Sequence, residues 1–195
     1  MNFRELVERN RTRRKFDQSR PMDEQVLVDL VELTRFTPSG ANKQPLKYAV
    51  TADPGLCAEV FPLLGWAAYL KDWNGPEEGQ RPTGYVVVML DKQVADTPGC
   101  DHGIAGQTIM LGAVEKGFGG CIIATVNRRK LAGLLDLPDH LEILLVLALG
   151  VPAQEVVVEA LPLGGDIKYW TGEDGRHHVP KRSLEELLVG RYPKK

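Results

Sequence analysis

Two continuous apolar runs constrain the fold of this chain more than any other feature. Residues 85–91 read Tyr-Val-Val-Val-Met-Leu-Asp, and residues 143–149 are similarly apolar. A strand with one wet face alternates apolar and polar residues, whereas an unbroken apolar run is typical of a strand buried on both faces. The sequence therefore predicts a sheet that helices cover on both sides.

Helical and strand-like patterns alternate along most of the chain. Further strands are predicted at residues 46–52 and 121–126, and helices at residues 1–8, 23–35, 54–64, 101–116, 128–135 and 184–188. Asp23 is the predicted N-cap of its helix, and the glycines in residues 117–120 end the fourth helix. With 195 residues, 43% of them hydrophobic, the chain can bury one substantial core, so we expect a single domain over residues 1–195.

Charge and cysteine content limit the classes of partner. A net charge of -2 and a pI near 6.1 give no positive field to attract a polyanion, so we expect no nucleic acid. Three scattered cysteines without CxxC spacing indicate a reducing compartment. The charged N-terminus does not read as a secretory signal, and no apolar run approaches the ~18 residues of a membrane span. The expected location is cytoplasmic, with no membrane association.

The C-terminal segment, about residues 151–195, breaks the regular rhythm. Residues 154–168 show no steady period, and residues 169–178 read as a hairpin with an Asp-Gly turn. Ser183, with Glu186 three residues later, fits a capping box. A long irregular segment is unusual in a self-contained domain, so this segment is expected to reach toward a second subunit.

Common catalytic and phosphate-binding motifs are missing from the sequence. It contains no GxxxxGK[ST], no GxGxxG after a strand and no GxSxG. The adjacent histidines 177 and 178 favour a structural or surface role over a metal site, because neighbours on a strand face opposite ways. We therefore expect no metal. A phosphate could still be held by the side chains of Arg11, Arg14, Lys181 and Arg182, with the Thr12 hydroxyl as a neutral partner.

Two stretches each allow two interpretations. Residues 9–15 are strongly basic, which favours a solvated arm, although Phe16 could anchor part of the run. Residues 66–73 contain two tryptophans and a tyrosine before a Gly/Pro loop. They fit either a helix packed on the core or an aromatic lid over a flat ligand.

Four stretches resemble the nitroreductase family of flavin mononucleotide (FMN) enzymes. Residues 11–16, Arg-Thr-Arg-Arg-Lys-Phe, resemble its R-S-x-R-x-F motif, and residues 37–45, Thr-Pro-Ser-Gly-Ala-Asn-Lys-Gln-Pro, resemble its A-P-S-G-x-N-x-Q-P motif. Residues 101–120 look like its dimer-forming helix and glycine turn, and residues 180–186 are similar to its C-terminal basic motif. Together, in the family's order, they cover nearly the whole chain.

The resemblance implies an α+β fold, with a mostly antiparallel sheet sandwiched by helices, in an intertwined homodimer. It implies that Arg11, Thr12 and Arg14 approach the ribityl phosphate and the pyrimidine edge of FMN, with Lys181 and Arg182 near the phosphate. It implies that Pro38, Ser39, Gly40 and Asn42 line the flavin of the other subunit. It implies that Ala124 and Thr125 offer backbone N–H groups toward flavin N5. Asn10 departs from a common arginine, and Ala124-Thr125 replaces a glycine-containing pair.

The implied activity is a ping-pong oxidoreductase that uses NAD(P)H, through FMN, to reduce nitroaromatic, quinone or similar small-molecule acceptors. No catalytic side chain is assigned, because the cofactor carries the chemistry. Alternatives are another reaction on the same fold, such as dehalogenation, enoate reduction or flavin breakdown, and a flavin-binding module without turnover. A basic-arm nucleic-acid binder is the weakest alternative.

Overall fold

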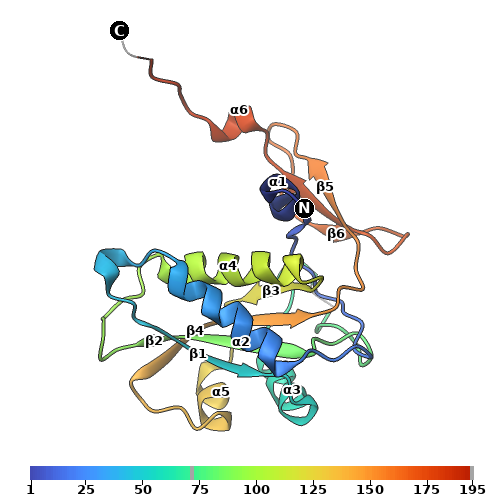
Figure 1. Cartoon of the computed structure of the whole chain (residues 1–195). Coiled ribbons are helices and arrows are strands. Elements are labelled where there is room, and N and C mark those ends of the chain that lie inside the picture. Colours follow the sequence, from blue (N-terminus) through green and yellow to red (C-terminus); the bar gives the residue numbers. More distant parts are fainter. Residues whose placement is uncertain (71–72, 194–195) are drawn as a thin grey trace.

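The computed structural model describes residues 1–70 and 73–193, and its centre is an antiparallel sheet. Along the sheet the order is β1-β2-β4-β3, and each neighbouring pair is antiparallel (Figure 1). The strands are β1 (Leu46–Thr51), β2 (Gly84–Asp91), β3 (Gly119–Ile123) and β4 (Leu141–Gly150). Both apolar runs of the sequence form inner strands, and every residue of β2 is buried, as predicted.

Helices cover the two faces of this sheet. They are α2 (Glu24–Glu32) and α4 (Asp101–Glu115) on one face, and α3 (Pro54–Val60) and α5 (Arg128–Leu134) on the other. Alternate side chains of β2 enter the two cores: Val86 and Val88 pack with the α2–α4 layer, and Tyr85 and Val87 with the α3–α5 layer. The predicted α+β fold, a sheet sandwiched by helices, is confirmed.

Local signals place the helix starts correctly, but two helices are shorter than predicted. The Asp23 side chain accepts a hydrogen bond from the backbone of Gln25 and caps α2, as expected. The α-helix ends at Glu32 and continues as the 3₁₀ turn η1 (Leu33–Phe36). Likewise α3 gives way to η3 (Phe61–Leu63). Pro62 explains the second break, because proline has no N–H for the helical ladder.

The C-terminal segment forms a second, smaller sheet with strand order β5-β7-β6. The strands are β5 (Val156–Ala160), β6 (Trp170–Thr171) and β7 (His177–Lys181). The predicted hairpin is confirmed as the antiparallel pair β6–β7. The prediction that residues 154–168 are irregular is wrong at β5, which pairs in parallel with β7. That partner lies far along the chain, so no local pattern announces the strand.

The last helix in the described residues is α6 (Leu184–Leu187), a single helical turn. The Ser183 hydroxyl accepts from the backbone of Glu186, as predicted. The predicted capping box does not close, because the Glu186 carboxylate accepts from Arg182 instead. None of the helices in the described residues is both long and apolar enough to span a bilayer.

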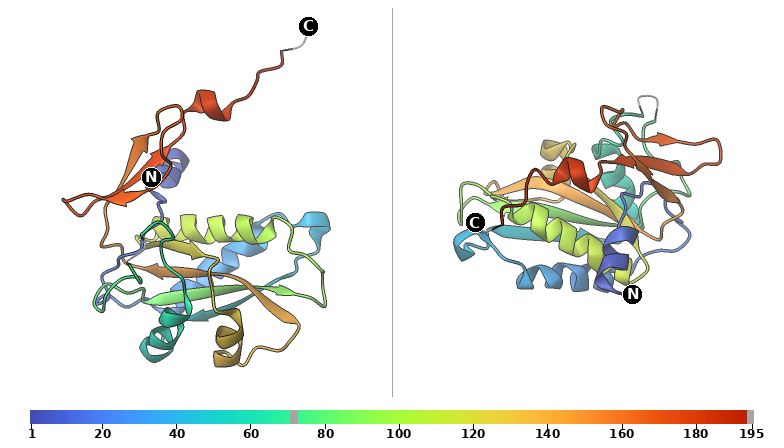
Figure 2. Two further views of the ribbon diagram at one scale, coloured as in Figure 1. Left: turned by 180° about the vertical axis from the view of Figure 1, so that it is seen from behind. Right: turned by 90° about the horizontal axis from the view of Figure 1, so that it is seen from above.

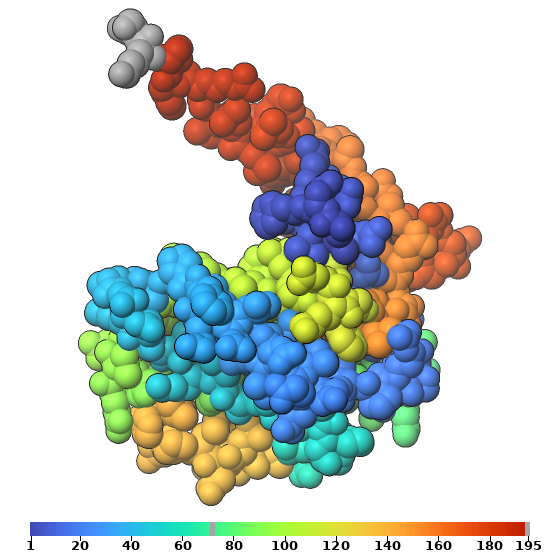
Figure 3. Space-filling view, in the orientation of Figure 1, coloured from blue at the N-terminus to red at the C-terminus, as the bar shows by residue number. Residues whose placement is uncertain are grey.

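The small sheet and α6 stand apart from the main sheet as an arm. Figure 2 shows this arm from two further sides, and in Figure 3 it extends beyond the body of the molecule. The N-terminal helix α1 (Phe3–Arg9) lies between the arm and α4. The arm carries large apolar side chains that are exposed in the single chain: Leu184, Leu187, Leu188, Val189 and Tyr192.

Candidate functional site

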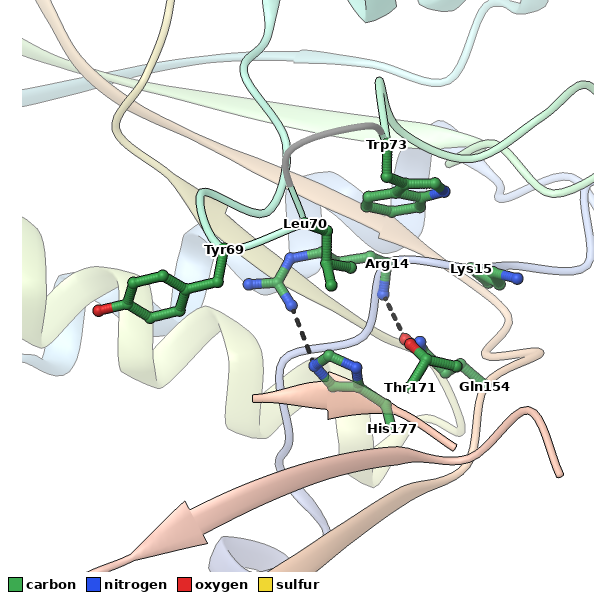
Figure 4. Close-up of a pocket in the computed structure, with 8 residues that line it drawn as sticks. All are labelled: Arg14, Lys15, Tyr69, Leu70, Trp73, Gln154, Thr171 and His177. Atoms are coloured by element: carbon green, nitrogen blue, oxygen red, sulfur yellow. Dashed lines mark hydrogen bonds between the residues drawn. The ribbon is translucent and has the colours of Figure 1, made fainter. Parts of the chain in front are cut away.

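A pocket of about 630 Å³ lies where the arm meets the body (Figure 4). Its lining comes from three segments that are far apart in the sequence: the N-terminal segment before α2, the aromatic segment after η3, and the C-terminal segment. The lining residues are Arg14, Lys15, Tyr69, Leu70, Trp73, Gln154, Thr171 and His177. Two of them are permanent cations, and none of the described lining residues carries a carboxylate.

Arg14 is held in a fixed position at this pocket. Its backbone N–H donates to Oε1 of Gln154 over 3.1 Å, and its guanidinium lies over the Tyr169 ring, 4.9 Å from the centroid. Its Nη1 lies 3.5 Å from Nε2 of His177. A cation held by backbone, aromatic and imidazole contacts loses little further side-chain entropy when it binds an anion.

His177 is a buried, neutral imidazole beside Arg14. It is 1% exposed, and burial, followed by the positive charge of Arg14, lowers its pKa to about 4. A guanidinium can only donate hydrogen bonds, so Nε2 accepts and the ring proton sits on Nδ1. Within the described residues Nδ1 has no hydrogen-bond partner.

Aromatic side chains surround Arg14 at the pocket (Figure 4). The Tyr69 and Tyr169 rings pack with centroids 5.1 Å apart, and the Tyr169 and His177 rings are also 5.1 Å apart. Trp73 lines the pocket and packs edge-on against Trp66. The alternative of a helix is wrong for residues 66–70, which form a turn without helix or strand structure. Tyr69 and Trp73 line the pocket, so the aromatic lid over a flat ligand stays a prediction. Lys71 and Asp72, which belong to the same segment, lie outside the described residues.

The loop at residues 37–45 is built around Asp101, the first residue of α4. The Ser39 hydroxyl donates to the Asp101 carboxylate, and the backbone N–H of Gly40 donates to its other oxygen over 3.1 Å. The backbone N–H of Gln44 donates to Oγ of Ser39 over 2.8 Å, which closes the loop. Two hollows, of about 510 and 230 Å³, adjoin it; Pro38, Ser39 and Gly40 line the first, and Asn42 lines the second.

The loop and the Arg14 pocket lie at opposite ends of α4 (Figure 1). Asp101 begins the helix. At the other end, the backbone N–H of Arg13, next to Arg14, donates to the carbonyl of Gly120 just beyond the helix end. A helix of 15 residues is about 22 Å long. A single chain therefore does not bring the predicted residues of the loop together with Arg14.

Comparison with known proteins shows which family the central part of the chain resembles. The nitroreductase family model matches residues 81–151, from before β2 to the end of β4. This central part of the chain therefore matches the nitroreductase family. A solved structure of a nitroreductase family protein from Clostridium novyi NT is 27% identical, with a TM-score of 0.63, over 78% of this chain and 86% of that one.

Two other solved structures share the nitroreductase fold at lower identity. Nitroreductase A from Vibrio parahaemolyticus is 23% identical over 84% of this chain and 74% of that chain, with a TM-score of 0.65. An FMN-dependent nitroreductase from Clostridium difficile R20291 is 18% identical over 77% of this chain and 87% of that chain, with a TM-score of 0.63. These likenesses extend the nitroreductase fold over most of the chain.

Ala124 and Thr125 follow β3 directly. The predicted strand at residues 121–126 is too long, because β3 ends at Ile123. The carbonyl of Ala124 accepts from Arg128 over 3.0 Å, and the carbonyl of Thr125 accepts from the backbone of Gly65 over 2.7 Å. Gly65 leads directly into the aromatic segment, so this exposed turn lies beside the chain that lines the pocket.

The other predicted phosphate ligands lie outside the Arg14 pocket in the described chain. The Arg11 guanidinium donates to the carbonyls of Val7 and Asn10 and so caps α1, and the exposed Thr12 pairs with Gly120. Lys181 is exposed at the end of β7, about 13 Å along the strand from His177. Arg182 pairs with Glu186 at 2.8 Å in an exposed ion pair.

The two adjacent histidines, His177 and His178, have different surroundings. His177 faces the pocket, whereas Nδ1 of His178 lies 2.7 Å from Glu159 and its ring stacks on Trp170. In the part of the chain that the structure describes, no group of three His, Cys, Asp or Glu side chains could hold a metal ion.

Sequence reasoning missed four pocket residues: Lys15, Gln154, Thr171 and His177. The hairpin gave a usable signal for two of them, because an Asp-Gly turn between short strands makes Thr171 and His177 cross-strand partners. No sequence signal identifies Gln154, because its position depends on the long-range contact of its side chain with the Arg14 backbone.

Proposed function

We propose that this protein is a homodimeric, FMN-dependent oxidoreductase that uses NAD(P)H to reduce nitroaromatic, quinone or similar small-molecule acceptors. The observation that carries the proposal is the Arg14 pocket, where a fixed cation lies among aromatic side chains in a chain whose central part matches the nitroreductase family. The similar structure from Clostridium difficile, an FMN-dependent nitroreductase, supports the choice of cofactor.

The chemistry of the pocket fits an anionic flavin. FMN joins a flat ring with carbonyl acceptors to a phosphate. Arg14 and Lys15 supply cationic donors, and Tyr69 and Trp73 supply apolar faces with polar edges. A carboxylate would repel the phosphate, and none occurs among the described lining residues.

Basic residues outside the pocket complete the proposed phosphate end. Arg11 and Thr12 precede Arg14, while Lys181 and Arg182 end the strand that begins at His177. The pair between Arg182 and Glu186 is exposed, and such pairs contribute only about 0–1 kcal/mol, so exchanging Glu186 for a phosphate costs little. Arg11 would exchange backbone carbonyls for the same anion, which is a stronger acceptor.

The protein's part in the reaction is to bind, orient and exclude water. When bound, FMN supplies hydride chemistry at N5, taking electrons from NAD(P)H and passing them to the acceptor in a ping-pong cycle. The backbone N–H groups of Ala124 and Thr125 would donate toward N5. Arg14 would stabilise negative charge at the pyrimidine edge. No side chain is assigned as a catalytic acid or base.

The homodimer follows from the distance between the two halves of the proposed site. Pro38, Ser39, Gly40 and Asn42 lie at the far end of α4, so they meet a flavin at Arg14 only if they come from a second copy. The exposed apolar side chains of the arm support the same arrangement, because burial on a partner removes them from water. The C-terminal segment, residues 151–195, would thus reach across one single-domain subunit to the other.

Anaerobic reduction tests the proposed enzyme. FMN-loaded protein is mixed with NADH or NADPH, the loss of flavin absorbance is followed, and a nitroaromatic or quinone is then added. We expect reduction by at least one nucleotide and repeated reoxidation by the acceptor. A flavin that bleaches once and is not reoxidised by acceptors identifies a binding module without turnover, and reoxidation only by other acceptor classes identifies a different reaction.

A further inference from the structure

Backbone contacts join the turn after β3 to the chain that leads into the aromatic segment of the pocket. The N–H of Gly65 donates to the carbonyl of Thr125 over 2.7 Å, and beside it Leu64 and Val126 form an antiparallel bridge. Residues 64–65 therefore run alongside residues 125–126 like a short strand pair. The aromatic segment starts at the next residue, Trp66.

Glycine is required at position 65 by the side chain of Thr125. A Cβ at position 65 would lie 2.5 Å from Cγ2 and 2.9 Å from Cβ of Thr125. Folded proteins essentially never show such short separations, because packed atoms repel steeply below van der Waals contact. Any larger residue must push Thr125, and with it the turn, away from the aromatic segment.

Arg128 holds the same turn from its other side. Its guanidinium donates to the carbonyls of Ala124 and Leu144 over 3.0 Å each, and to the carbonyl of Ile143 over 2.8 Å. These bonds tie the turn to β4, a buried strand of the main sheet. The Ala124–Thr125 backbone is therefore fixed between a rigid strand and Gly65.

The aromatic segment is equally well fixed at Trp66. The Trp66 ring packs 5.4 Å from Phe61 and 6.5 Å from Trp73, measured between centroids. Gly75 approaches the same indole so closely that a Cβ there would lie 2.7 Å from it. Trp66 therefore has little room to move if a side chain is added at position 65. The turn at Ala124 and Thr125 must move instead.

We infer that Gly65 is a positioning residue, which sets the Ala124–Thr125 backbone against the aromatic segment and thereby fixes the N–H groups offered to flavin N5. The inference rests on the proposed function. Gly65 and Thr125 act as a matched pair, because the absence of a side chain at position 65 makes room for the side chain of Thr125. Gly65 affects the midpoint potential of the flavin more than the affinity for flavin, because the phosphate and Arg14 contacts lie elsewhere.

The test compares Gly65→Ala with Gly133→Ala, an identical substitution in α5 that has no atom within 4 Å of the new Cβ. For each protein, the midpoint potential of bound FMN, the FMN dissociation constant and the rate of anaerobic reduction are measured. Gly65→Ala should shift the potential and slow reduction by about tenfold or more, with FMN affinity within about threefold of wild type. Gly133→Ala should match the wild type in all three.

A double variant tests whether removing the clash restores the potential and the reduction rate. Gly65→Ala/Thr125→Gly removes both clashing atoms, so its potential and reduction rate should return to those of Thr125→Gly alone, within about threefold. Should Gly65→Ala not fold, Arg128→Lys takes its place. It removes the guanidinium fork and should shift the potential in the folded holoprotein.

Unchanged potential and rate in folded Gly65→Ala, or in Arg128→Lys, would overturn the positioning role alone. A wild-type protein that binds no FMN would overturn the proposed function, and the positioning role with it.

Discussion

The Ser39 hydroxyl donates a 2.5 Å hydrogen bond to the carboxylate of Asp101. The same carboxylate accepts the backbone N–H of Gly40, and Asp101 is only 8% exposed. Between these contacts, Ala41, Asn42 and Gln44 adopt positive φ angles of 49°, 56° and 51°. Such angles cost about 1 kcal/mol or more each for residues other than glycine, so the first residue of α4 holds a strained loop in one shape.

Asp101→Asn should loosen this loop. An amide has one oxygen to replace two and no charge, so we expect the free energy of unfolding to fall by about 1–3 kcal/mol. FMN affinity should fall too if the loop meets the partner's flavin. Asp96→Asn, at an exposed position, is the control. Urea unfolding and FMN titration report the two effects; curves superimposed on the wild type would show that the clamp is dispensable.

Arg14→Ala should weaken FMN binding. The side chain is the fixed cation of the pocket, and a charge-assisted hydrogen bond contributes roughly 1–3 kcal/mol, or about a 5- to 150-fold change in dissociation constant. Fluorescence titration measures it. Arg129→Ala, on the exposed surface of α5, should bind like the wild type. Equal affinity of the two variants would remove Arg14 from the site.

Stability should depend on pH through His177. Its folded pKa, about 4, lies below its ordinary value of 6.5, so between these values the unfolded chain binds more protons. The free energy of unfolding therefore rises with pH through this window, and up to about 3 kcal/mol of it is lost as pH falls from 6.5 to 4. Urea unfolding across pH 4–7 measures the slope.

His177→Phe should remove that slope, whereas His140→Gln should keep it. The first substitution deletes the buried titrating ring, and the second changes a histidine outside the pocket. A slope that survives in His177→Phe would mean that other groups produce the acid sensitivity.

Val189→Asp should weaken the proposed dimer. Val189 is 94% exposed in the single chain, so a charge there leaves the subunit's own core intact but opposes burial against a partner. Sedimentation velocity should show more monomer at a given concentration. Val28→Asp, on the outer surface of α2, is the comparison. The arm has no part in assembly if both variants sediment as the wild type does.

Local patterns predicted the body of the fold well. The apolar run of β2 needs burial on both faces wherever it is placed, and the Asp23 cap acts within three residues. The arm was harder. β5 and β7 pair in parallel across 16 intervening residues, from 161 to 176, so neither strand's pattern alone identifies the other.

The candidate site could be predicted only in part, because it is formed by contacts between residues that are far apart in the sequence. The motif residues Arg14 and Ser39 were singled out, and their contacts with His177 and Asp101 could not be read from spacing. The end of β3 was missed for the same reason: Thr125 leaves the strand to pair with Gly65, which lies 60 residues earlier.

Flavin stoichiometry, measured together with molecular mass, tests whether the protein is a dimer that binds FMN. Apo-protein is titrated with FMN by fluorescence and the product is sedimented with detection at flavin wavelengths. We expect a yellow dimer that holds about one non-covalent FMN per chain. A protein that stays colourless with added FMN, or a stable monomer that binds FMN as tightly as the dimer, would contradict this expectation.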